Sequence, residues 1–263
     1  MEIKVLGPLV AHENGMSITP IPRKPRQVFS LLALQAGTMV TVPAFIEELW
    51  GMHPPASALS TLQTYILQVR RGLAAALGAN CTDSAKDVLT TSYGGYLLDI
   101  DPDDVDVNRY ERLVAAGKQA FEAGRWEPAS ELFSQALDIW RGEALADVHA
   151  GLRIGVEVAR LEESKLGVLE ARIETDLRLG RHVGLLAELS ALTARYPMHE
   201  NFWAQFMIAL HRAGRKSQAL ENFIKLRTTL VNELGVEPSA RLQHLQQALL
   251  RSDPKLDAGR VFV

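Results

Sequence analysis

Hydrophobic residues recur at alternating steps of three and four between positions 59 and 73, which is the spacing of one face of an α-helix. The apolar stripe predicted from this spacing consists of Leu59, Leu62, Ile66, Val69 and Leu73. The opposite face carries hydroxyls, one amide and one guanidinium, where a surface helix usually carries long Glu and Lys side chains. These polar residues are Ser57, Ser60, Thr61, Thr64, Gln68 and Arg71. The two faces predict a helix that packs along one side and meets a polar partner closely along the other.

Short elements of both kinds surround this helix within the first hundred residues. The predicted elements are an antiparallel sheet over residues 2–18, helices over 26–37, 42–51 and 60–77, and a hairpin over 88–100. Asn14-Gly15 and Gly94-Gly95 favour the tight turns that connect antiparallel strands. His53-Pro54-Pro55 excludes a helix and forces a turn before the third helix. A sheet, three helices and a hairpin in this order predict a winged helix-turn-helix domain.

From residue 106 onward the hydrophobic pattern is almost wholly helical. The predicted helices cover residues 106–123, 127–139, 151–179, 182–195, 199–213, 215–234 and 238–250. The junctions at Gly124, Gly180 and Gly214 share a spacing, in which one apolar residue follows after five residues and another after nine. These two residues are Ala and then Phe after Gly124 and Gly214, and Leu twice after Gly180. This spacing matches the helical pairs of tetratricopeptide repeats, which bury their faces by stacking on neighbouring pairs.

The predicted fold class is therefore mostly α with small β elements, and the chain is expected to divide into two domains and a tail. We expect a winged helix-turn-helix domain over residues 1–100, an all-α tetratricopeptide-like helical-repeat domain over 101–252 and a C-terminal tail over 253–263. The acidic, proline-containing stretch over residues 99–106 fits a linker or the rim of an interface between domains.

The residues on the polar face of the third helix are of the types that bind in the major groove of DNA. Short hydroxyl side chains let the helix backbone approach the base edges, and they bond to phosphates or bases. Gln68 can pair with adenine through two hydrogen bonds, and Arg71 can pair with guanine or a phosphate. Arg70, at the border of the apolar stripe, is expected to reach a phosphate. A solvated surface is the alternative, but the third helix before a hairpin is the position of a recognition helix.

Basic and polar residues outside this helix complete the candidate interface. Arg23, Lys24 and Arg26 precede the first helix closely enough in sequence to form one basic cluster that neutralises phosphates. Thr91 and Tyr93, beside the turn of the second hairpin, are expected to touch phosphate or the minor groove. The candidate DNA-binding residues are Arg23, Lys24, Arg26, Ser57, Ser60, Thr61, Thr64, Gln68, Arg70, Arg71, Thr91 and Tyr93.

The charge balance limits how strongly one copy of this domain attracts DNA. The chain has 263 residues and a formal net charge of −3. Within residues 1–100, seven Lys and Arg residues balance seven Asp and Glu residues. We therefore expect a modest affinity per copy, for which binding of two or more copies to repeated half-sites compensates.

Composition and motifs argue against secretion, membrane insertion, metal binding and catalysis. The N-terminus lacks an apolar signal sequence, and no apolar run approaches the ~18 residues that span a bilayer. The single cysteine, Cys81, cannot form an internal disulfide, fits a reducing cytoplasm and is expected to be inert. The seven histidines show no HxxxH or HExxH spacing, and no phosphate-cradling loop or nucleophile elbow is present. We therefore expect no enzyme activity, no metal and no cofactor.

Five segments make the chain similar to a known family. They are KPRQVFSLLAL from Lys24, IEELWG from Ile46, PPASALSTLQTYILQVRRGL from Pro54, GGYLLDIDPDDVDVNRYERL from Gly94 and LVNELGVEPSARLQHLQQALL from Leu230. In these segments, which span nearly the whole chain, the sequence resembles the Streptomyces antibiotic regulatory protein family. The resemblance is to the short form, an OmpR-type winged helix followed by a bacterial transcriptional activation domain.

The resemblance implies a cytoplasmic, nucleoid-associated activator of a secondary-metabolite (antibiotic) gene cluster. Such a protein binds direct repeats near the promoter −35 element as a homodimer or higher assembly, and it recruits RNA polymerase through its sigma factor or alpha subunit. The loop over residues 50–55 and the repeat domain are the candidates for polymerase contact. The wing sequence departs from the family in lacking an arginine or lysine. The alternative left open is a repeat-type protein-interaction scaffold, or a repressor without activation function.

Overall fold

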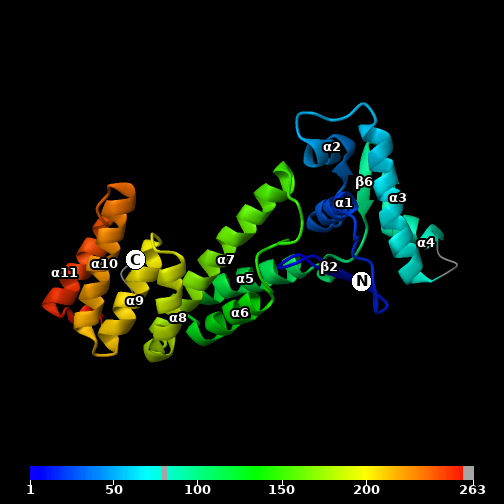
Figure 1. Cartoon of the computed structure of the whole chain (residues 1–263). Coiled ribbons are helices and arrows are strands. Elements are labelled where there is room, and N and C mark those ends of the chain that lie inside the picture. Colours follow the sequence, from blue (N-terminus) through cyan, green and yellow to red (C-terminus); the bar gives the residue numbers. More distant parts are fainter. Residues whose placement is uncertain (79–81, 257–263) are drawn as a thin grey trace. The chain divides into compact units, whose positions relative to one another are not determined.

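The structure is a computed structural model, which describes residues 1–78 and 82–256 (Figure 1). The chain forms two compact units, the first made of residues 1–114 and 135–166 and the second of residues 115–134 and those from 167 onward. These units differ in their limits from the predicted domains, whose boundary at residue 100 stays a prediction. Cys81 and the part of the predicted tail from residue 257 lie outside the described residues.

The first unit begins with a three-stranded antiparallel sheet in which β2 lies between β1 and β3. Its strands are β1 (Glu2–Lys4), β2 (Val10–Glu13) and β3 (Met16–Ser17). The turn between β2 and β3 consists of Asn14 and Gly15, with positive φ angles of 49° and 77°. Asn and Gly adopt this backbone conformation most readily, so the predicted hairpin turn is confirmed.

Four helices and a second sheet follow in the first unit. They are α1 (Arg23–Leu34), β4 (Val40–Thr41), α2 (Val42–Trp50), α3 (Ala58–Leu77), α4 (Thr82–Val88), β5 (Leu89–Ser92) and β6 (Gly95–Leu98). β6 lies between β4 and β5 and is antiparallel to both. Three helices and a closing hairpin make a winged helix, which confirms this part of the predicted fold class. The short elements α4 and β4 were not predicted from the hydrophobic pattern.

The buried face of α3 differs from the predicted stripe at its first position. Leu59 is 51% exposed, whereas Ala58 is 5% exposed and takes the inward place. Ala58 begins the helix, and steps of four residues lead from it to the buried residues Leu62 and Ile66. Leu59 lies 100° further round the helix and points outward. The prediction for Leu59 is therefore wrong, while the rest of the stripe packs in the core against α1 and α2.

Carboxylates attach the first sheet to the helical part of the first unit. This part consists of η1 (Pro102–Asp104), the start of α5 (Asp106–Glu122), the end of α6 (Trp126–Asp138), the start of α7 (Leu152–Arg178) and the connection between α6 and α7. Asp106 accepts hydrogen bonds from the backbone N–H groups of Val5 and Leu6 at 2.8 and 3.1 Å, and Asp147 accepts one from Leu9 at 2.7 Å. Burial raises the pKa of Asp106 above its ordinary value, although these bonds oppose the shift.

The second unit is a stack of helices. It contains the remaining parts of α5, α6 and α7, followed by α8 (His182–Arg195), α9 (Glu200–Arg212), α10 (Lys216–Leu234), α11 (Ala240–Arg251) and η2 (Pro254–Leu256). α8, α9 and α10 pack side by side in chain order (Figure 1). In the described part of the chain, no helix is long and apolar enough to cross a membrane.

The three predicted repeat junctions share one turn geometry. Gly124, Gly180 and Gly214 have left-handed φ angles of 71°, 76° and 76°. In each turn the N–H group of the following arginine donates to the carbonyl five residues earlier, at 2.9, 2.9 and 2.8 Å. The residues five and nine positions after each glycine are buried. The spacing predicted for a helical repeat is therefore confirmed, and so is the fold class.

Candidate nucleic-acid interface

α3 presents the predicted polar face to solvent. Ser57, Ser60, Thr64, Gln68 and Arg71 are exposed, and Thr61 is half-buried. The Ser60 hydroxyl donates to the Ser57 carbonyl and the Thr64 hydroxyl to the Ser60 carbonyl, both at 3.0 Å. Because these protons are used within the helix, the hydroxyl oxygens remain as acceptors. The exocyclic amines of adenine and cytosine in the major groove are the matching donors.

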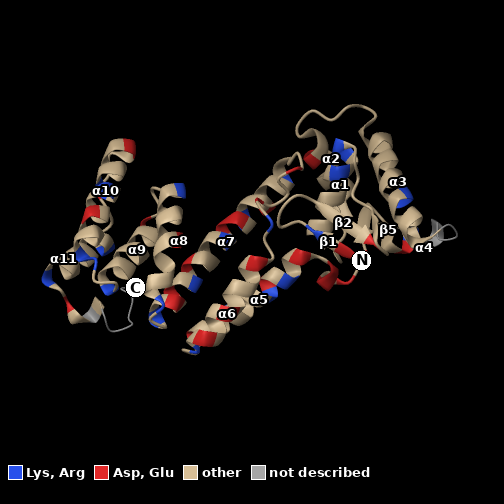
Figure 2. Ribbon diagram, turned by 60° about the horizontal axis from the view of Figure 1, so that its bottom comes forward, with Lys and Arg blue, Asp and Glu red and all other residues tan. Residues whose placement is uncertain are grey.

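Gln68 and Arg71 are the long side chains of this face. In the described residues neither side chain forms a hydrogen bond or an ion pair, and both are exposed. They border a groove whose other wall is formed by residues 17–22 and Pro25. An amide and a guanidinium with their donors available are the groups that read adenine and guanine edges. Figure 2 marks the basic positions of α3 and α1 as blue segments of those helices.

Arg70 lies at the border of the polar face and is bound within the protein. Its Nε and one Nη donate to the Leu89 carbonyl at 3.0 and 2.6 Å, and the same Nη donates to the Thr91 hydroxyl at 2.8 Å. Burial lowers the pKa of the Arg70 guanidinium from its ordinary value. The DNA contacts predicted for Arg70 and Thr91 compete with these bonds.

The structure does not gather Arg23, Lys24 and Arg26 into one exposed cluster. The Lys24 ammonium donates to the Leu49 carbonyl near the end of α2, where helix carbonyls lack intrahelical partners. Burial lowers the pKa of Lys24. Arg26 pairs with Asp147 at 3.1 Å. Arg23 is exposed and makes no side-chain bond among the described residues, so it is the member of the three that is free to bind a phosphate.

The hairpin of β5 and β6 closes through a two-residue turn, Tyr93-Gly94, between the paired residues Ser92 and Gly95. Gly94 has a φ angle of +85°, and a Cβ atom on Gly95 would lie 2.3 Å from the Val40 carbonyl oxygen. The backbone at Gly94 therefore favours glycine, and Gly95 has no room for a side chain. Tyr93 is fully exposed at this turn. The hairpin thus presents an aromatic ring to any partner.

Comparisons with known proteins agree with this geometry. Residues 105–250 match the family described as bacterial transcriptional activator domain. Regulatory protein DnrI of Streptomyces peucetius is 75% identical over 257 residues, which cover 98% of this chain and 94% of that protein. Transcriptional regulator RedD of Streptomyces coelicolor is 36% identical over 97% of this chain and 72% of its own length. The solved structure of Mycobacterium tuberculosis EmbR in complex with a low-affinity phosphopeptide has a TM-score of 0.89 and 31% identity, over 98% of this chain and 67% of that one.

The chain belongs to the Streptomyces antibiotic regulatory protein family. The activator domain matches the helical repeats, and the winged helix before it has the architecture of a DNA-binding domain. This member of the family is a transcriptional activator. The predicted family and regulatory function are therefore confirmed, whereas the individual DNA-binding residues stay predictions.

This antibiotic regulatory protein also contains a buried carboxylate that was not recognised from the sequence. Glu48, at the end of α2, is 3% exposed. Its carboxylate accepts hydrogen bonds from the backbone N–H groups of Gly151, Arg153 and Ile154 at 2.5, 2.8 and 3.1 Å, and from the Gln27 amide at 2.9 Å. These N–H groups lie at the start of α7, where they have no helical partners. Glu48 thus caps α7 and ties it to α2.

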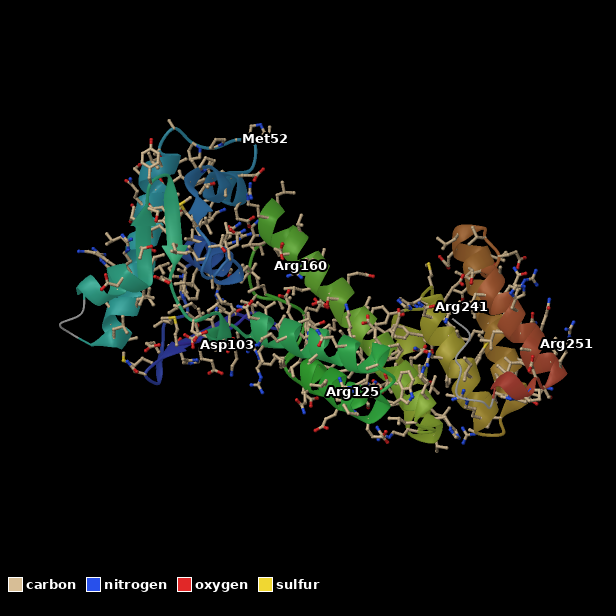
Figure 3. All side chains as sticks on the ribbon, turned by 180° about the vertical axis from the view of Figure 1, so that it is seen from behind. Met52, Asp103, Arg125, Arg160, Arg241 and Arg251 are labelled. Carbon is tan, nitrogen blue, oxygen red and sulfur yellow. The ribbon has the colours of Figure 1, made fainter. Side chains whose placement is uncertain are left out.

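The Glu48 cap lies directly before the α2–α3 loop, residues 51–57. Trp50 stacks on Tyr65 of α3, with 6.5 Å between the ring centres. Met52, in the loop, is 90% exposed (Figure 3). The loop is therefore anchored at α2 and α3 while its middle is available to a partner. Glu48 follows the buried residue Phe45 at helical spacing, so the sequence contained a signal that it faces inward.

Proposed function

We propose that the chain activates a secondary-metabolite gene cluster by binding direct repeats near the promoter −35 element and recruiting RNA polymerase. The observation that supports this proposal is the exposed polar face of α3, on which Gln68 and Arg71 keep their hydrogen-bonding groups available. In this proposal the protein acts on double-stranded DNA in the cytoplasm, at the nucleoid. It needs no cofactor, because binding energy alone performs the recruitment.

Each exposed group of the interface has a role that its chemistry sets. Gln68 pairs with adenine through two hydrogen bonds, and Arg71 pairs with guanine or holds a phosphate. The hydroxyl oxygens of Ser60 and Thr64 accept from base amines where α3 enters the groove. Arg23 neutralises a phosphate beside the groove and fixes the register of the protein on the duplex.

The balanced charge of the DNA-binding part favours binding as a homodimer or higher assembly. Few exposed arginines and lysines face the duplex. Binding of one copy therefore releases few counterions from the DNA, and its affinity is modest. Occupation of neighbouring repeats makes the second binding event effectively intramolecular. The α2–α3 loop with Met52 and the helical repeats then remain available to the sigma factor or the alpha subunit of RNA polymerase.

Replacement of Arg71 tests this assignment directly. We expect Arg71→Ala to weaken binding to the promoter by about 10- to 100-fold, the value of one good base contact, and Gln68→Ala to weaken it less. Gel-shift titration of the full chain measures the change. Arg215→Ala is the matched control, because Arg215 is an exposed arginine of the second unit without a side-chain bond among the described residues.

Two results of this titration would overturn the proposal. Unchanged affinity for both Arg71→Ala and Gln68→Ala, with the same thermal unfolding as the unmodified protein, would remove α3 as the recognition helix. Equal affinity for promoter DNA and for a scrambled duplex would favour the protein-interaction scaffold, since a scaffold has no sequence preference.

A further inference from the structure

Arg70 joins the recognition helix to the wing, which we define as the hairpin of β5 and β6. Two of its N–H groups bind one backbone carbonyl, that of Leu89, and a third reaches the Thr91 hydroxyl two residues further along β5. A planar guanidinium that donates twice to one acceptor fixes the direction of approach as well as the distance. Arg70 therefore sets the position of β5 relative to α3.

The surroundings of Arg70 hold the guanidinium in this place. Its centre lies 6.0 Å from the ring centre of Tyr96, which is 7% exposed and in edge contact with Phe45. Among the described residues no carboxylate forms an ion pair with Arg70. The adjacent Arg71 is exposed and forms no side-chain bond in the same part of the chain. The two neighbouring arginines thus differ, since one turns toward the wing and the other toward solvent.

The wing offers DNA an uncharged contact. Residues 89–98 contain no Lys or Arg, and the turn places Tyr93 next to two glycines without side chains. The ring is fully exposed, so the protein core gains nothing from it. Apolar side chains, phenylalanine among them, enter the minor groove of DNA and make contacts there that need no charge. A tyrosine at the tip of a wing without cations has the shape and polarity for that place.

We propose that Arg70 is a positioning residue, which sets the wing so that the Tyr93 ring packs against the deoxyribose walls of the minor groove beside the site that α3 reads. The inference rests on the proposed function, because it requires bound promoter DNA. It replaces the phosphate contact expected from the sequence with an indirect role. Arg70 then contributes to affinity through Tyr93 and not through its own charge.

A double-mutant cycle between Arg70 and Tyr93 tests this coupling. We expect Arg70→Ala and Tyr93→Ala each to weaken promoter binding by the full chain about tenfold, and the double variant to be about as weak as either single variant. Tyr93→Phe keeps the affinity, since the ring suffices. Arg70→Lys keeps the charge but cannot donate twice to the Leu89 carbonyl, so it does not restore binding.

The salt dependence separates positioning from a direct phosphate contact. If Arg70 acts through the wing, Arg70→Ala leaves the slope of log K against log salt concentration unchanged. If Arg70 holds a phosphate, the slope falls by about 0.9, Arg70→Lys restores binding, and the effects of Arg70→Ala and Tyr93→Ala multiply. That second set of results would overturn the inference. Faster amide hydrogen exchange in β5 and β6 of free Arg70→Ala is expected as well.

The Arg71→Ala variant separates failure of this inference from failure of the proposed function. Weaker binding by Arg71→Ala together with multiplying effects at Arg70 and Tyr93 overturns the positioning role alone. Unchanged affinity for the variants at Arg70 and Tyr93, and for both Arg71→Ala and Gln68→Ala, overturns both. If Arg70→Ala does not fold, the same cycle is measured with Arg70→Lys, and a coupling of zero then overturns the positioning role.

Discussion

Replacing Glu48 with Ala removes the carboxylate that caps the start of α7. Three backbone N–H groups and the Gln27 amide then lose an acceptor at a site where Glu48 is 3% exposed. Each buried donor left without a partner costs about 1–3 kcal/mol, and water that enters the vacated space satisfies some of them. We therefore expect the free energy of unfolding to fall by about 3–5 kcal/mol, as when one partner of a buried charged pair is removed.

Thermal unfolding followed by calorimetry measures this loss. For a protein of this size, 1 kcal/mol corresponds to about 2–4 °C in Tm, so Glu48→Ala is expected to lower the Tm by roughly 10 °C. Glu47→Ala is the matched control. Its carboxylate pairs with Arg153 at 2.6 Å, but the two side chains are 42% and 44% exposed, and such pairs contribute about 1 kcal/mol at most. Melting of the two variants within about 2 °C of each other would refute the reasoning.

Two further predictions concern the first unit. Gly151→Ala is expected to lower the Tm, because its Cβ would lie 2.2 Å from the Glu48 carbonyl oxygen. A Cβ on Gly155 would have nothing within 4 Å, so Gly155→Ala is expected to stabilise α7 by about 0.5–1 kcal/mol. Equal Tm shifts for the two variants in calorimetry would contradict this difference. The raised pKa of Asp106 means that its contribution to stability falls as the pH rises from 3.8 through the raised value. In urea unfolding, the free energy of unfolding of the unmodified protein is therefore expected to exceed that of Asp106→Asn by more at pH 4 than at pH 7. The same difference at both pH values would exclude this linkage.

Hydrophobic spacing was sufficient to predict elements that local interactions determine. The turns at Gly124, Gly180 and Gly214 repeat because each backbone needs a left-handed residue at the same place, followed by buried residues at fixed distances. The same local rule predicted the hairpin at Asn14-Gly15. It failed at Leu59, because the residue at which a helix begins decides which side chains of its first turn face inward. α3 begins at Ala58, and Ala58 takes the inward position.

The roles of single charges were not predictable, because their partners lie far away in the sequence. Arg26 and Asp147 are 121 positions apart, and Glu48 and Gly151 are 103 apart. Lys24 and Arg70 bind backbone carbonyls, which every residue carries and which leave no mark in the sequence. Gln68 and Arg71 were placed correctly on an exposed face, since helix periodicity alone sets which side they occupy.

The bond between Arg70 and the Leu89 carbonyl sets a condition for re-engineering operator preference in this family. A backbone acceptor is supplied by any residue at position 89, so an arginine at position 70 can bind hairpins of varied sequence. An α3 transplanted without that arginine would lose the hydrogen bonds to the carbonyl at position 89. The position of the hairpin relative to α3 would then no longer be fixed. Helix and hairpin are therefore best exchanged together, as one cassette, when a regulator is redirected to new genes.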